Sequence, residues 1–332
     1  MKKIELILII LFIISFCGYS HANDDFEKWK IKFKAYAEQQ GISSITLDNH
    51  IDKSKFLPDV IKYDRYQPEF YEDTKTYVNK RTSSKKVTKG LKIYNSNSKF
   101  IDSIDLKFSI DKELLLSLMA IETNYGTYLG KMDIVSSLAT LSFDKRRSKF
   151  FTNELITLLK LIDNKIVDPI LYQGSWAGAY GNFQFMPTTI KNYAIDFDKN
   201  NKIELKSIED SFASAANYLN KIGWKQNQPC YFKIKLKNNT PEYLLNTSAK
   251  KIHNKKKFKF FKKYINNIEK FNIDENYKVA IIIPDKDIIP GSNNISPAYL
   301  IYDNYEKILN WNRSLRFALA VCTLKESFEN EI

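Results

Sequence analysis

Residues 121–126 read Ile-Glu-Thr-Asn-Tyr-Gly and end an apolar helical pattern with one carboxylate, followed by residues that favour a sharp turn. Leu114, Leu118 and Glu122 are spaced by four residues, which places them on one face of a helix. Apolar surroundings disfavour the charged form of a carboxyl group and raise its pKa, so Glu122 is a candidate general acid near neutral pH. The alternative interpretation is an ordinary surface glutamate at a helix end.

The composition is that of a folded, strongly basic protein. Of 332 residues, 44% are hydrophobic and 14% aromatic, which is enough to bury one large core or two smaller ones. The formal net charge is +13 at pH 7. Such a charge favours an anionic partner, such as a cell-wall polymer, a membrane surface or a nucleic acid.

The N-terminal segment has the pattern of a signal peptide. Lys2 and Lys3 precede an apolar run over residues 6–14, and residues 20–22 (Ser-His-Ala) offer small side chains where a cleavage site requires them. A retained membrane anchor is the alternative, but the run is shorter than the roughly 20 residues that cross a bilayer. We therefore expect residues 1–22 to be removed on export to the periplasm, which argues against a nucleic-acid partner.

The cysteines raise two questions about covalent bonds. A lipid on Cys17 would anchor the protein to the outer membrane, although the bulky Phe16 stands where lipoprotein signals have a small residue. Cys230 and Cys322 remain after cleavage, in a compartment that permits disulfides, but their wide separation gives no spacing signal. The sequence leaves both questions open.

Histidines are too few for several common hydrolytic sites. Only His50 and His253 lie outside the predicted signal peptide, so no histidine-rich zinc spacing is present in the sequence. A serine–histidine–aspartate triad is disfavoured for the same reason. Carboxylates are therefore the expected acid–base groups.

Helical periodicity dominates the chain up to about residue 224. Apolar residues recur at helical spacing in eight segments: 25–40, 64–81, 111–122, 134–142, 148–163, 188–193, 210–222 and 308–324. In the second of these, an extended step at Gln67-Pro68 comes before the helix. Asp111 is expected to cap the helix that carries Glu122. Alternating apolar and basic residues predict a strand at 230–237, and an apolar run predicts another at 277–283.

These patterns predict a mainly α protein of the α+β class. We expect a helical region over 23–224, a small β-containing subdomain over 225–295 and a helical return over 296–332. Within the subdomain, lysines and aromatic residues are mixed in KKKFKFFKKY at 255–264. This segment fits either polymer binding or a solvated helix whose Phe and Tyr residues pack inward.

The segment GSWAGAYGNFQFMP at 174–187 is a second candidate site. Glycines let a backbone approach a ligand closely, and Trp176 and Phe185 offer flat faces that stack on sugar rings. A tight helix crossing would also explain the glycines, but it would not explain Ser175 together with Gln184. We therefore favour a ligand groove beside this segment.

One polar loop follows the spacing of a calcium-binding loop. Oxygen-bearing side chains occupy positions one, three, five and nine, namely Asp196, Asp198, Asn200 and Glu204. Position seven, Lys202, would supply its backbone carbonyl. Asn201 stands where glycine is usual and can adopt a left-handed conformation, whereas Ser207 stands where a bidentate glutamate is expected. Glu209 or Asp210 would then complete the shell, unless the loop is a metal-free polar turn.

Arg146 and Arg147 stand at the start of a predicted helix, where the helix N-terminus is already partly positive. Cations are unfavourable at such a position, so we expect the two arginines to have a binding role. Binding of a sugar's lactyl carboxylate or of acidic peptide stems would provide one. A solvated basic cluster is the alternative.

Taken in order, these segments resemble the membrane-bound lytic transglycosylase B family, periplasmic enzymes that cut the glycan strands of peptidoglycan. The resemblance extends over about residues 26–328 and is carried by separate motifs: AIETNYG, SLATLSFDKRR, GSWAGAYGNFQFMP, YAIDFD, ANYLNKIGW and ILNWNRSLRFALAV. It implies a lysozyme-like helical catalytic domain with a small β-containing subdomain. It also implies a monomer that acts on peptidoglycan glycan strands, needs no cofactor for its chemistry and binds a structural Ca²⁺.

The resemblance makes Glu122 the sole catalytic acid–base. Glu122 would protonate the oxygen between N-acetylmuramic acid and N-acetylglucosamine, then deprotonate the muramyl 6-hydroxyl as it attacks the anomeric carbon. The product would be a 1,6-anhydromuramyl end, and no second carboxylate would be needed, unlike in most glycosidases. A lysozyme-type muramidase that uses water and an inactive wall-binding protein are the alternatives.

The resemblance also implies roles for other residues. The implied substrate-binding residues are Ser175, Gln184, Arg146, Arg147, Tyr218, Phe185, Tyr125 and Tyr77, and the implied calcium-loop residues are Asp196, Asp198, Asn200, Lys202 and Asp210. Among these, Ser175 and Gln184 would contact the sugars, and Tyr218 would support the site. At three positions where some members carry tyrosine, the chain loses the hydroxyl and keeps a stacking surface: Phe150, Trp311 and Phe317.

Overall fold

The structure is a computed structural model that describes residues 23–167, 173–270, 273–286 and 295–332. The expected signal peptide and Cys17 lie outside these residues. The described chain forms two compact units: a first unit of residues up to 65, 129–192 and 200–203, and a second unit of residues 66–128, 193–199 and 204–332. Within the described residues, no helix combines the length and the apolar composition that crossing a membrane requires.

The first unit is mainly helical and has an aromatic cluster in its core. Residues 23–39 are helical, which confirms the helix predicted at 25–40. Phe26 on this helix is fully buried, and its ring centroid lies 5.4, 5.5 and 5.6 Å from those of Trp29, Phe56 and Phe143. Aromatic side chains at helical spacing therefore anchor the N-terminal helix to this unit.

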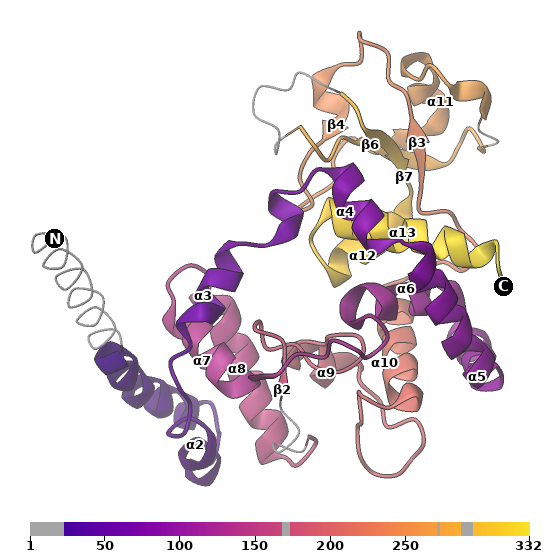
Figure 1. The fold of residues 1–332 in the computed structure, drawn as a ribbon. Helices are drawn as coiled ribbons and strands as arrows, with labels where there is room; N and C mark the ends of the chain where they lie inside the picture. Colours follow the sequence, from indigo (N-terminus) through magenta and orange to yellow (C-terminus); the bar gives the residue numbers. More distant parts are fainter. Residues whose placement is uncertain (1–22, 168–172, 271–272, 287–294) are drawn as a thin grey trace, which may run out of the picture. The chain divides into compact units, whose positions relative to one another are not determined.

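The other elements of the first unit are short, apart from two packed helices. They are α2 (Ser44–His50), α3 (Pro58–Arg65), β1 (Met132–Asp133), α7 (Ile134–Phe143), α8 (Ser148–Asp163), β2 (Gln173–Gly174) and most of α9 (Pro187–Tyr193). Figure 1 shows α7 and α8 side by side, and the two helices pack extensively against each other. Strand β1 pairs antiparallel with β2, with Met132 opposite Gly174.

Helices of the second unit surround a buried C-terminal helix. They are η1 (Pro68–Phe70), α4 (Thr74–Arg81), α5 (Ser84–Phe108), α6 (Lys112–Thr123), α10 (Ile208–Lys221), α12 (Asp303–Trp311) and α13 (Leu315–Glu329). Helix α13 packs on α4, α5, α6 and α12. The helix predicted at 308–324 is therefore two helices, because the chain is extended at Asn312 (φ −140, ψ 122).

Two local predictions in this unit differ from the structure. The sequence patterns predict no helix at 84–99, yet this segment begins the 25-residue helix α5, which has non-helical torsion angles at Asn97. Its Gly90 is a packing requirement, since a Cβ there would lie 2.3 Å from the Phe328 ring. Asp111 stands at the N-cap of α6 but makes no capping bond, because its carboxylate accepts from the Trp224 indole at 2.7 Å.

A five-stranded sheet completes the second unit. Its strands are β3 (Tyr231–Ile234), β4 (Leu245–Asn246), β5 (Lys256–Lys257), β6 (Lys278–Ile282) and β7 (Ala298–Ile301), arranged β3-β7-β6-β4 with β5 also paired to β6. The β4–β6 pair is parallel and the others are antiparallel. The predicted strands at 230–237 and 277–283 correspond to β3 and β6. Strand β7 lies in the segment expected to be helical, because a short buried apolar run has no periodicity that distinguishes the two states.

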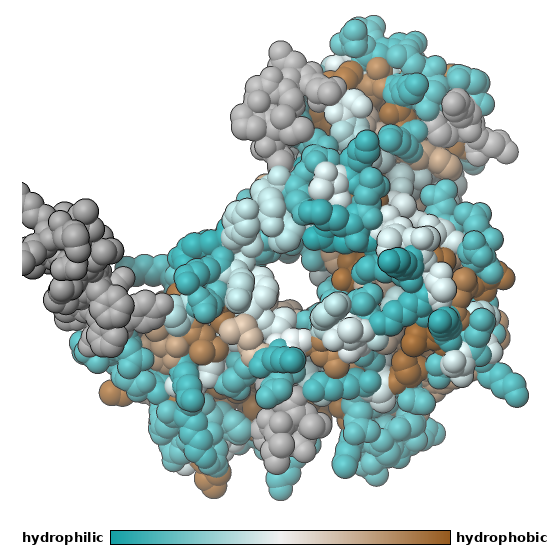
Figure 2. Space-filling model, in the orientation of Figure 1, coloured by the Kyte–Doolittle hydropathy of each residue, from teal (hydrophilic) through white to brown (hydrophobic). Residues whose placement is uncertain are grey.

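The lysine-rich segment 255–264 packs its aromatic residues inward. It forms β5, the short helix α11 (Phe258–Phe261) and a 3-10 turn, η4 (Lys262–Tyr264); two further 3-10 turns are η3 (Glu242–Leu244) and η5 (Ile268–Lys270). Phe258 and Phe261 are 2% and 0% exposed and belong to the core of the sheet region. Figure 2 shows mainly hydrophilic residues on the visible face of that region. This arrangement agrees with the inward-packing interpretation of the segment.

A disulfide joins the sheet to the C-terminal helix. Cys230 immediately precedes β3, Cys322 lies in α13, and their Cα atoms are 6.0 Å apart. The Tyr231 and Thr323 hydroxyl groups next to the bond are hydrogen-bonded at 2.7 Å. The pairing that the sequence left open is therefore present.

The disulfide predicts a measurable contribution to stability. Replacing both cysteines by serine should lower the free energy of unfolding by about 2–4 kcal/mol, because the bond closes a long loop in the unfolded chain. Urea unfolding with and without reductant measures this. Reduction should destabilise the wild type and leave the Cys230→Ser/Cys322→Ser variant unchanged; equal stability of the oxidised and reduced wild type would contradict the expectation.

Candidate active site

Glu122 lies next to the end of α6, where the main chain turns sharply. Asn124 and Tyr125 both adopt left-handed conformations, with φ 49 and 59. The Tyr125 N–H donates to the Met119 carbonyl at 3.2 Å, and the Asn124 N–H donates to the Ala120 carbonyl at 3.1 Å. These bonds satisfy carbonyls at the helix end and reverse the chain directly after the acid. The turn predicted from Thr-Asn-Tyr-Gly is confirmed.

The Trp311 indole holds the Glu122 carboxyl group. Its N–H donates to Glu122 Oε1, with the two atoms 2.9 Å apart. The Trp311 ring stacks on Tyr218 at 5.0 Å between centroids, and Tyr218 stacks on Tyr193 at 4.3 Å. The Tyr218 hydroxyl donates to the Asn310 carbonyl at 3.1 Å. Because this stack restricts the indole, it fixes the direction from which Oε1 accepts its hydrogen bond.

Burial raises the pKa of Glu122 to about 8. The hydrogen bond from Trp311 lowers this pKa because it favours the ionised form, whereas the negative charge of Glu69 raises it further. Leu114 and Leu118, on the same face of α6, are fully buried. The glutamate on a leucine face predicted from the sequence is thus a carboxyl group that keeps its proton at neutral pH.

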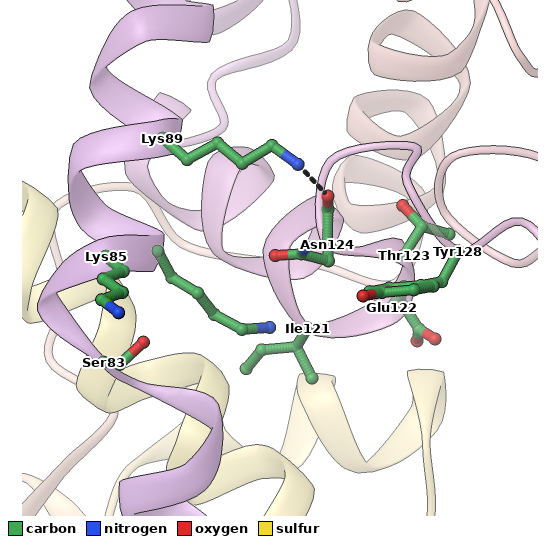
Figure 3. A pocket seen from close by; sticks show the side chains of 9 residues that line it. Ser83, Lys85, Lys89, Ile121, Glu122, Thr123, Asn124 and Tyr128 are labelled. Atoms are coloured by element: carbon green, nitrogen blue, oxygen red, sulfur yellow. Dashed lines mark hydrogen bonds between the residues drawn. The ribbon is translucent and has the colours of Figure 1, made fainter.

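A cavity of about 400 Å³ lies beside Glu122, between the start of α5 and the end of α6 (Figure 3). Ser83, the N-cap residue of α5, lines one part of it. Tyr128 lines another part and is 70% exposed, so an accessible aromatic face lies near the acid. Glu122 can therefore be reached from solvent even though its carboxyl group is largely surrounded by protein.

Two tyrosines that were predicted to bind substrate are buried in this unit. Tyr77 in α4 is 3% exposed, and the Arg81 guanidinium carbon lies 3.5 Å from its ring centre. Burial raises the pKa of Tyr77, the charge of Arg81 lowers it, and carboxylates that include Glu122 raise it, so Tyr77 and Glu122 interact electrostatically. Tyr125 is 7% exposed, and its hydroxyl donates to the Lys86 carbonyl at 2.8 Å. This bond joins α5 to the turn that follows α6; substrate contact by Tyr125 stays a prediction.

The segment 174–187 forms a tight turn in the first unit, and packing requires its glycines. Gly178 has φ 86, and a Cβ there would lie 2.5 Å from the Leu138 side chain in α7. A Cβ at Gly174 would lie 2.2 Å from the Ala179 carbonyl oxygen. Close packing therefore accounts for these two glycines, but in a turn and not in the helix crossing of the alternative interpretation.

Ser175 and Gln184 keep hydrogen-bonding capacity in this turn. Ser175 Oγ accepts from the Ala179 N–H at 3.0 Å, and the hydroxyl hydrogen remains able to donate. Gln184, with φ 51, donates its side-chain amide to the Gly181 carbonyl at 2.9 Å, which leaves its own side-chain oxygen able to accept. Phe185 is 3% exposed and packs inside the turn, and its contact with substrate stays a prediction.

Arg146 and Arg147 share one buried acid, Asp64. Arg146 Nε donates to Asp64 Oδ2 at 2.6 Å, and Arg147 donates to the other carboxylate oxygen. Burial raises the pKa of Asp64, but the two guanidinium groups outweigh this effect and the pKa is lowered. The acid explains why two cations are tolerated before α8. Their side chains remain 42% and 41% exposed, so both can also face a ligand.

Three acids of the expected calcium loop lie together in the second unit. Asp196, Asp198 and Asp210 each place one carboxylate oxygen within 4.8 Å of the others. Oxygens bound to one Ca²⁺ at 2.3–2.6 Å have separations of this size, so the donor set fits the ion. Asp210 is fully buried and also accepts from the N–H groups of Phe197 and Glu204, both at 2.8 Å.

The rest of the loop has the expected backbone form. Asn201 has φ 67, which confirms the left-handed conformation where a glycine is usual. Asn200 and Lys202 belong to the first unit, where the Lys202 N–H donates to the Asn200 side-chain oxygen at 2.8 Å. Among the described residues, Glu209 is not part of the acidic cluster.

Comparison with known proteins identifies the family of the chain. A family model described as "Transglycosylase SLT domain" matches residues 25–326. The chain belongs to this family. Membrane-bound lytic murein transglycosylase B of Escherichia coli (strain K12) is 35% identical over 139 residues, which are 42% of this chain and 38% of the relative. The matched part is thus well under half of that protein.

Solved structures of transglycosylases share the fold of this family member. Pseudomonas aeruginosa SltB3, crystallised with NAG-NAM-pentapeptide, is 29% identical, with a TM-score of 0.79 over 92% of this chain and 79% of that one. Escherichia coli Slt35, solved in complex with calcium, is 23% identical, with a TM-score of 0.72 over 93% of this chain and 94% of that one. The mainly helical, lysozyme-like fold with a small sheet is therefore confirmed.

Two residues acquire roles that the sequence patterns did not indicate. Trp311 was expected to replace a tyrosine with loss of its hydroxyl, but the indole N–H supplies a hydrogen-bond donor to Glu122. Asp64 lies 82 residues before Arg146, so no local spacing could have linked the pair. For Trp311, the available signal was the motif ILNWNRS combined with the donor-only chemistry of indole.

The hydrogen bond predicts how Trp311 controls the ionisation of Glu122. In Trp311→Phe, stacking on Tyr218 is retained and the donor is lost, so the pKa of Glu122 should rise further. Nuclear magnetic resonance of the labelled glutamate carboxyl carbons during a pH titration measures this, with Glu122→Gln identifying the resonance. A lower pKa in Trp311→Phe would contradict the role of the bond.

Proposed function

We propose that this family member is a lytic transglycosylase that cleaves the β-1,4 bond between N-acetylmuramic acid and N-acetylglucosamine and leaves 1,6-anhydromuramyl ends. The observation that carries the proposal is Glu122, a carboxyl group protonated at neutral pH and oriented by Trp311 beside a cavity. Family membership and the likeness to a transglycosylase crystallised with NAG-NAM-pentapeptide support it.

In this proposal, Glu122 serves first as the acid and then as the base. Since the Trp311 N–H can only donate, Oε1 accepts and the proton resides on Oε2. Oε2 protonates the glycosidic oxygen as its bond to the anomeric carbon breaks. The carboxylate then removes the proton of the muramyl 6-hydroxyl while that oxygen bonds to the anomeric carbon. Glu122 regains its proton, and the Trp311 bond stabilises the ionised intermediate stage.

A muramidase that uses water is the second candidate, because Glu69 lies within electrostatic reach of Glu122. Enzymes with two carboxylates hold them about 5 to 9.5 Å apart, and one acts as nucleophile or as base for water. Among the described residues, however, Glu122 is the only acid that lines the cavity. This favours the reaction in which the sugar supplies the nucleophile.

Other residues receive proposed roles in glycan binding. The Ser175 hydroxyl can donate and the Gln184 side-chain oxygen can accept, which suits the carbonyl and N–H of a sugar acetamido group. Arg146 and Arg147 offer partly exposed guanidinium groups to anionic parts of the glycan. We propose Tyr218 as a support for Trp311, through their stacking.

We also propose that Asp196, Asp198 and Asp210 hold a structural Ca²⁺ together with the loop backbone. The three carboxylate oxygens support this, as does the left-handed Asn201. Bound Ca²⁺ would neutralise acids that otherwise repel one another at the start of α10. Glu122 needs no metal for either of its proton transfers.

The proposed site of action is peptidoglycan in the periplasm. The net charge of +13 suits an anionic wall polymer, and we expect no nucleic-acid partner. The name of the E. coli relative includes "membrane-bound", and a lipid on Cys17 would give this chain a comparable attachment. We propose that the protein acts as a monomer.

Product analysis tests the reaction. Mass spectrometry of peptidoglycan digested by the wild type should detect 1,6-anhydromuramyl ends, and Glu122→Gln should lower the rate by at least about 100-fold, because it cannot exchange a proton. Reducing muramic acid ends in place of anhydro ends would overturn the transglycosylase proposal. A wild type that cleaves nothing would indicate a wall-binding protein.

Glu69→Gln separates the two enzymatic candidates. It removes a carboxylate charge near Glu122 and should leave anhydro products as the outcome, with the alkaline limit of activity moved to lower pH because Glu69 raises the pKa of Glu122. Loss of activity similar to that of Glu122→Gln would favour a two-carboxylate mechanism.

Thermal unfolding tests the calcium site without an activity measurement. Calcium at about 100 times its dissociation constant should stabilise the protein by about 2.7 kcal/mol, and a chelator should reverse this. Asp198→Asn, at an exposed acid of the cluster, should weaken the response, while Glu209→Gln serves as the control outside the cluster. A melting temperature that is unchanged by calcium and by chelator would exclude the site.

A further inference from the structure

Three lysines of α5 line the cavity beside Glu122: Lys85, Lys86 and Lys89. The Lys86 ammonium donates to the Ala120 carbonyl at 2.6 Å, and the Lys89 ammonium donates to the Asn124 carbonyl at 2.8 Å. Figure 3 shows Lys89 reaching from α5 to the end of α6. The Lys89 ammonium also donates to the Thr127 hydroxyl at 2.5 Å. Because an ammonium has three N–H donors, these bonds hold both groups in place and leave Lys86 two donors and Lys89 one for a ligand.

The positive charge of this cavity is not compensated by acids. Within the described part of the chain, none of the three lysines pairs with a carboxylate, whereas the nearby Lys80 and Arg81 both pair with Glu72. Glu122 is the only acid among the described lining residues, and it is protonated at neutral pH. The cavity therefore presents a positive potential next to a neutral acid.

The surroundings of Lys86 disfavour its charged form. Burial lowers the pKa of Lys86, and the positive charges of Arg81 and Lys89 lower it further. An anion in the cavity would oppose these effects and raise the pKa of Lys86, because a negative charge stabilises the ammonium form. A carboxylate is the simplest such group on a peptidoglycan strand.

We propose that Lys85, Lys86 and Lys89 form a subsite beside Glu122 that binds a carboxylate of the glycan substrate. The cavity volume of about 400 Å³ is within the range of small-ligand sites. The carboxylate comes either from a peptide stem or, where the stem has been removed, from the muramyl lactyl group. The inference rests on the proposed transglycosylase function and adds a charge requirement for its substrate.

Such a subsite acts on binding and leaves the chemistry unchanged. Lys86 and Lys89 bond to backbone carbonyls before and after Glu122, so an anion held there is fixed relative to the acid. Since the charge of the bound carboxylate does not change during cleavage, the interaction stabilises ground state and transition state alike. Its loss should raise KM and leave kcat close to the wild-type value.

The test compares Lys85→Gln with Lys92→Gln. Lys92 lies on the same helix, is exposed and does not line the cavity, so it controls for the loss of charge on α5. Lys86 and Lys89 are kept because they hold the Ala120 and Asn124 carbonyls. We expect KM for stem-bearing glycan to rise about 3- to 5-fold in Lys85→Gln, the usual range for one charge-assisted bond at an exposed site.

Three substrates distinguish the source of the carboxylate. They are glycan with free stem carboxylates, the same glycan with these carboxylates amidated, and stem-free glycan with a free lactyl carboxylate. A KM effect that is present with the first and lost with the second assigns the subsite to the stem. A KM effect that is present with stem-free glycan assigns it to the lactyl group as well.

Lys85→Glu is a second variant, because Lys85 is exposed and its substitution leaves the bonds to α6 intact. It should raise KM for the free-carboxylate substrates more than for the amidated one. Equal KM values for all variants, or an equal rise with the amidated substrate, would overturn the subsite. These outcomes require an active wild type that forms anhydro ends, so they differ from failure of the proposed function, in which no such ends are formed.

Discussion

The hydrogen bond from Trp311 to Glu122 joins two residues that are 189 positions apart in the chain. A buried carboxyl group with one fixed donor has a defined orientation and a defined free oxygen, and both depend on where α12 places the indole. The stack of Trp311 on Tyr218 and of Tyr218 on Tyr193 adds two aromatic contacts to this placement. The position of α12 in the second unit is therefore the constraint on which the acid depends.

Helix α13 supplies that constraint. It packs on α12 and on α6, the helices that carry Trp311 and Glu122, and it is tied to the sheet by the disulfide at Cys322. A buried ion pair adds a second connection, since Arg316 of α13 donates to Asp285 at 2.7 Å, close to the end of β6. The same Asp285 accepts from the Thr74 N–H at 2.9 Å at the start of α4. The sheet thus supports the acid through α13, although none of its described residues lines the cavity.

How much the sequence predicts depends on whether the decisive contact is local. Helix α8 has the bounds that periodicity predicts, Asn201 has the predicted left-handed form, and the chain turns after Glu122 as expected, because each depends on neighbouring residues. By contrast, the acid shared by Arg146 and Arg147 is supplied by Asp64, from a distant segment. Helix α5 was missed because its polar, serine- and asparagine-rich middle has little helical signal of its own, and tertiary packing at Gly90 stabilises it.

The burial of Glu122 also makes the stability of the fold depend on pH. A glutamate has an ordinary pKa of 4.5, and in the folded protein that of Glu122 is about 8. Below pH 4.5 the folded and unfolded chains both hold this proton. Between pH 4.5 and about 8 only the unfolded chain releases it. The free energy of unfolding therefore falls by up to about 1.4 kcal/mol per pH unit as pH rises through this range. Asp64 behaves in the opposite way, since its lowered pKa makes its contribution present above its ordinary pKa and lost in acid. Through Glu122, mild acidification stabilises the fold.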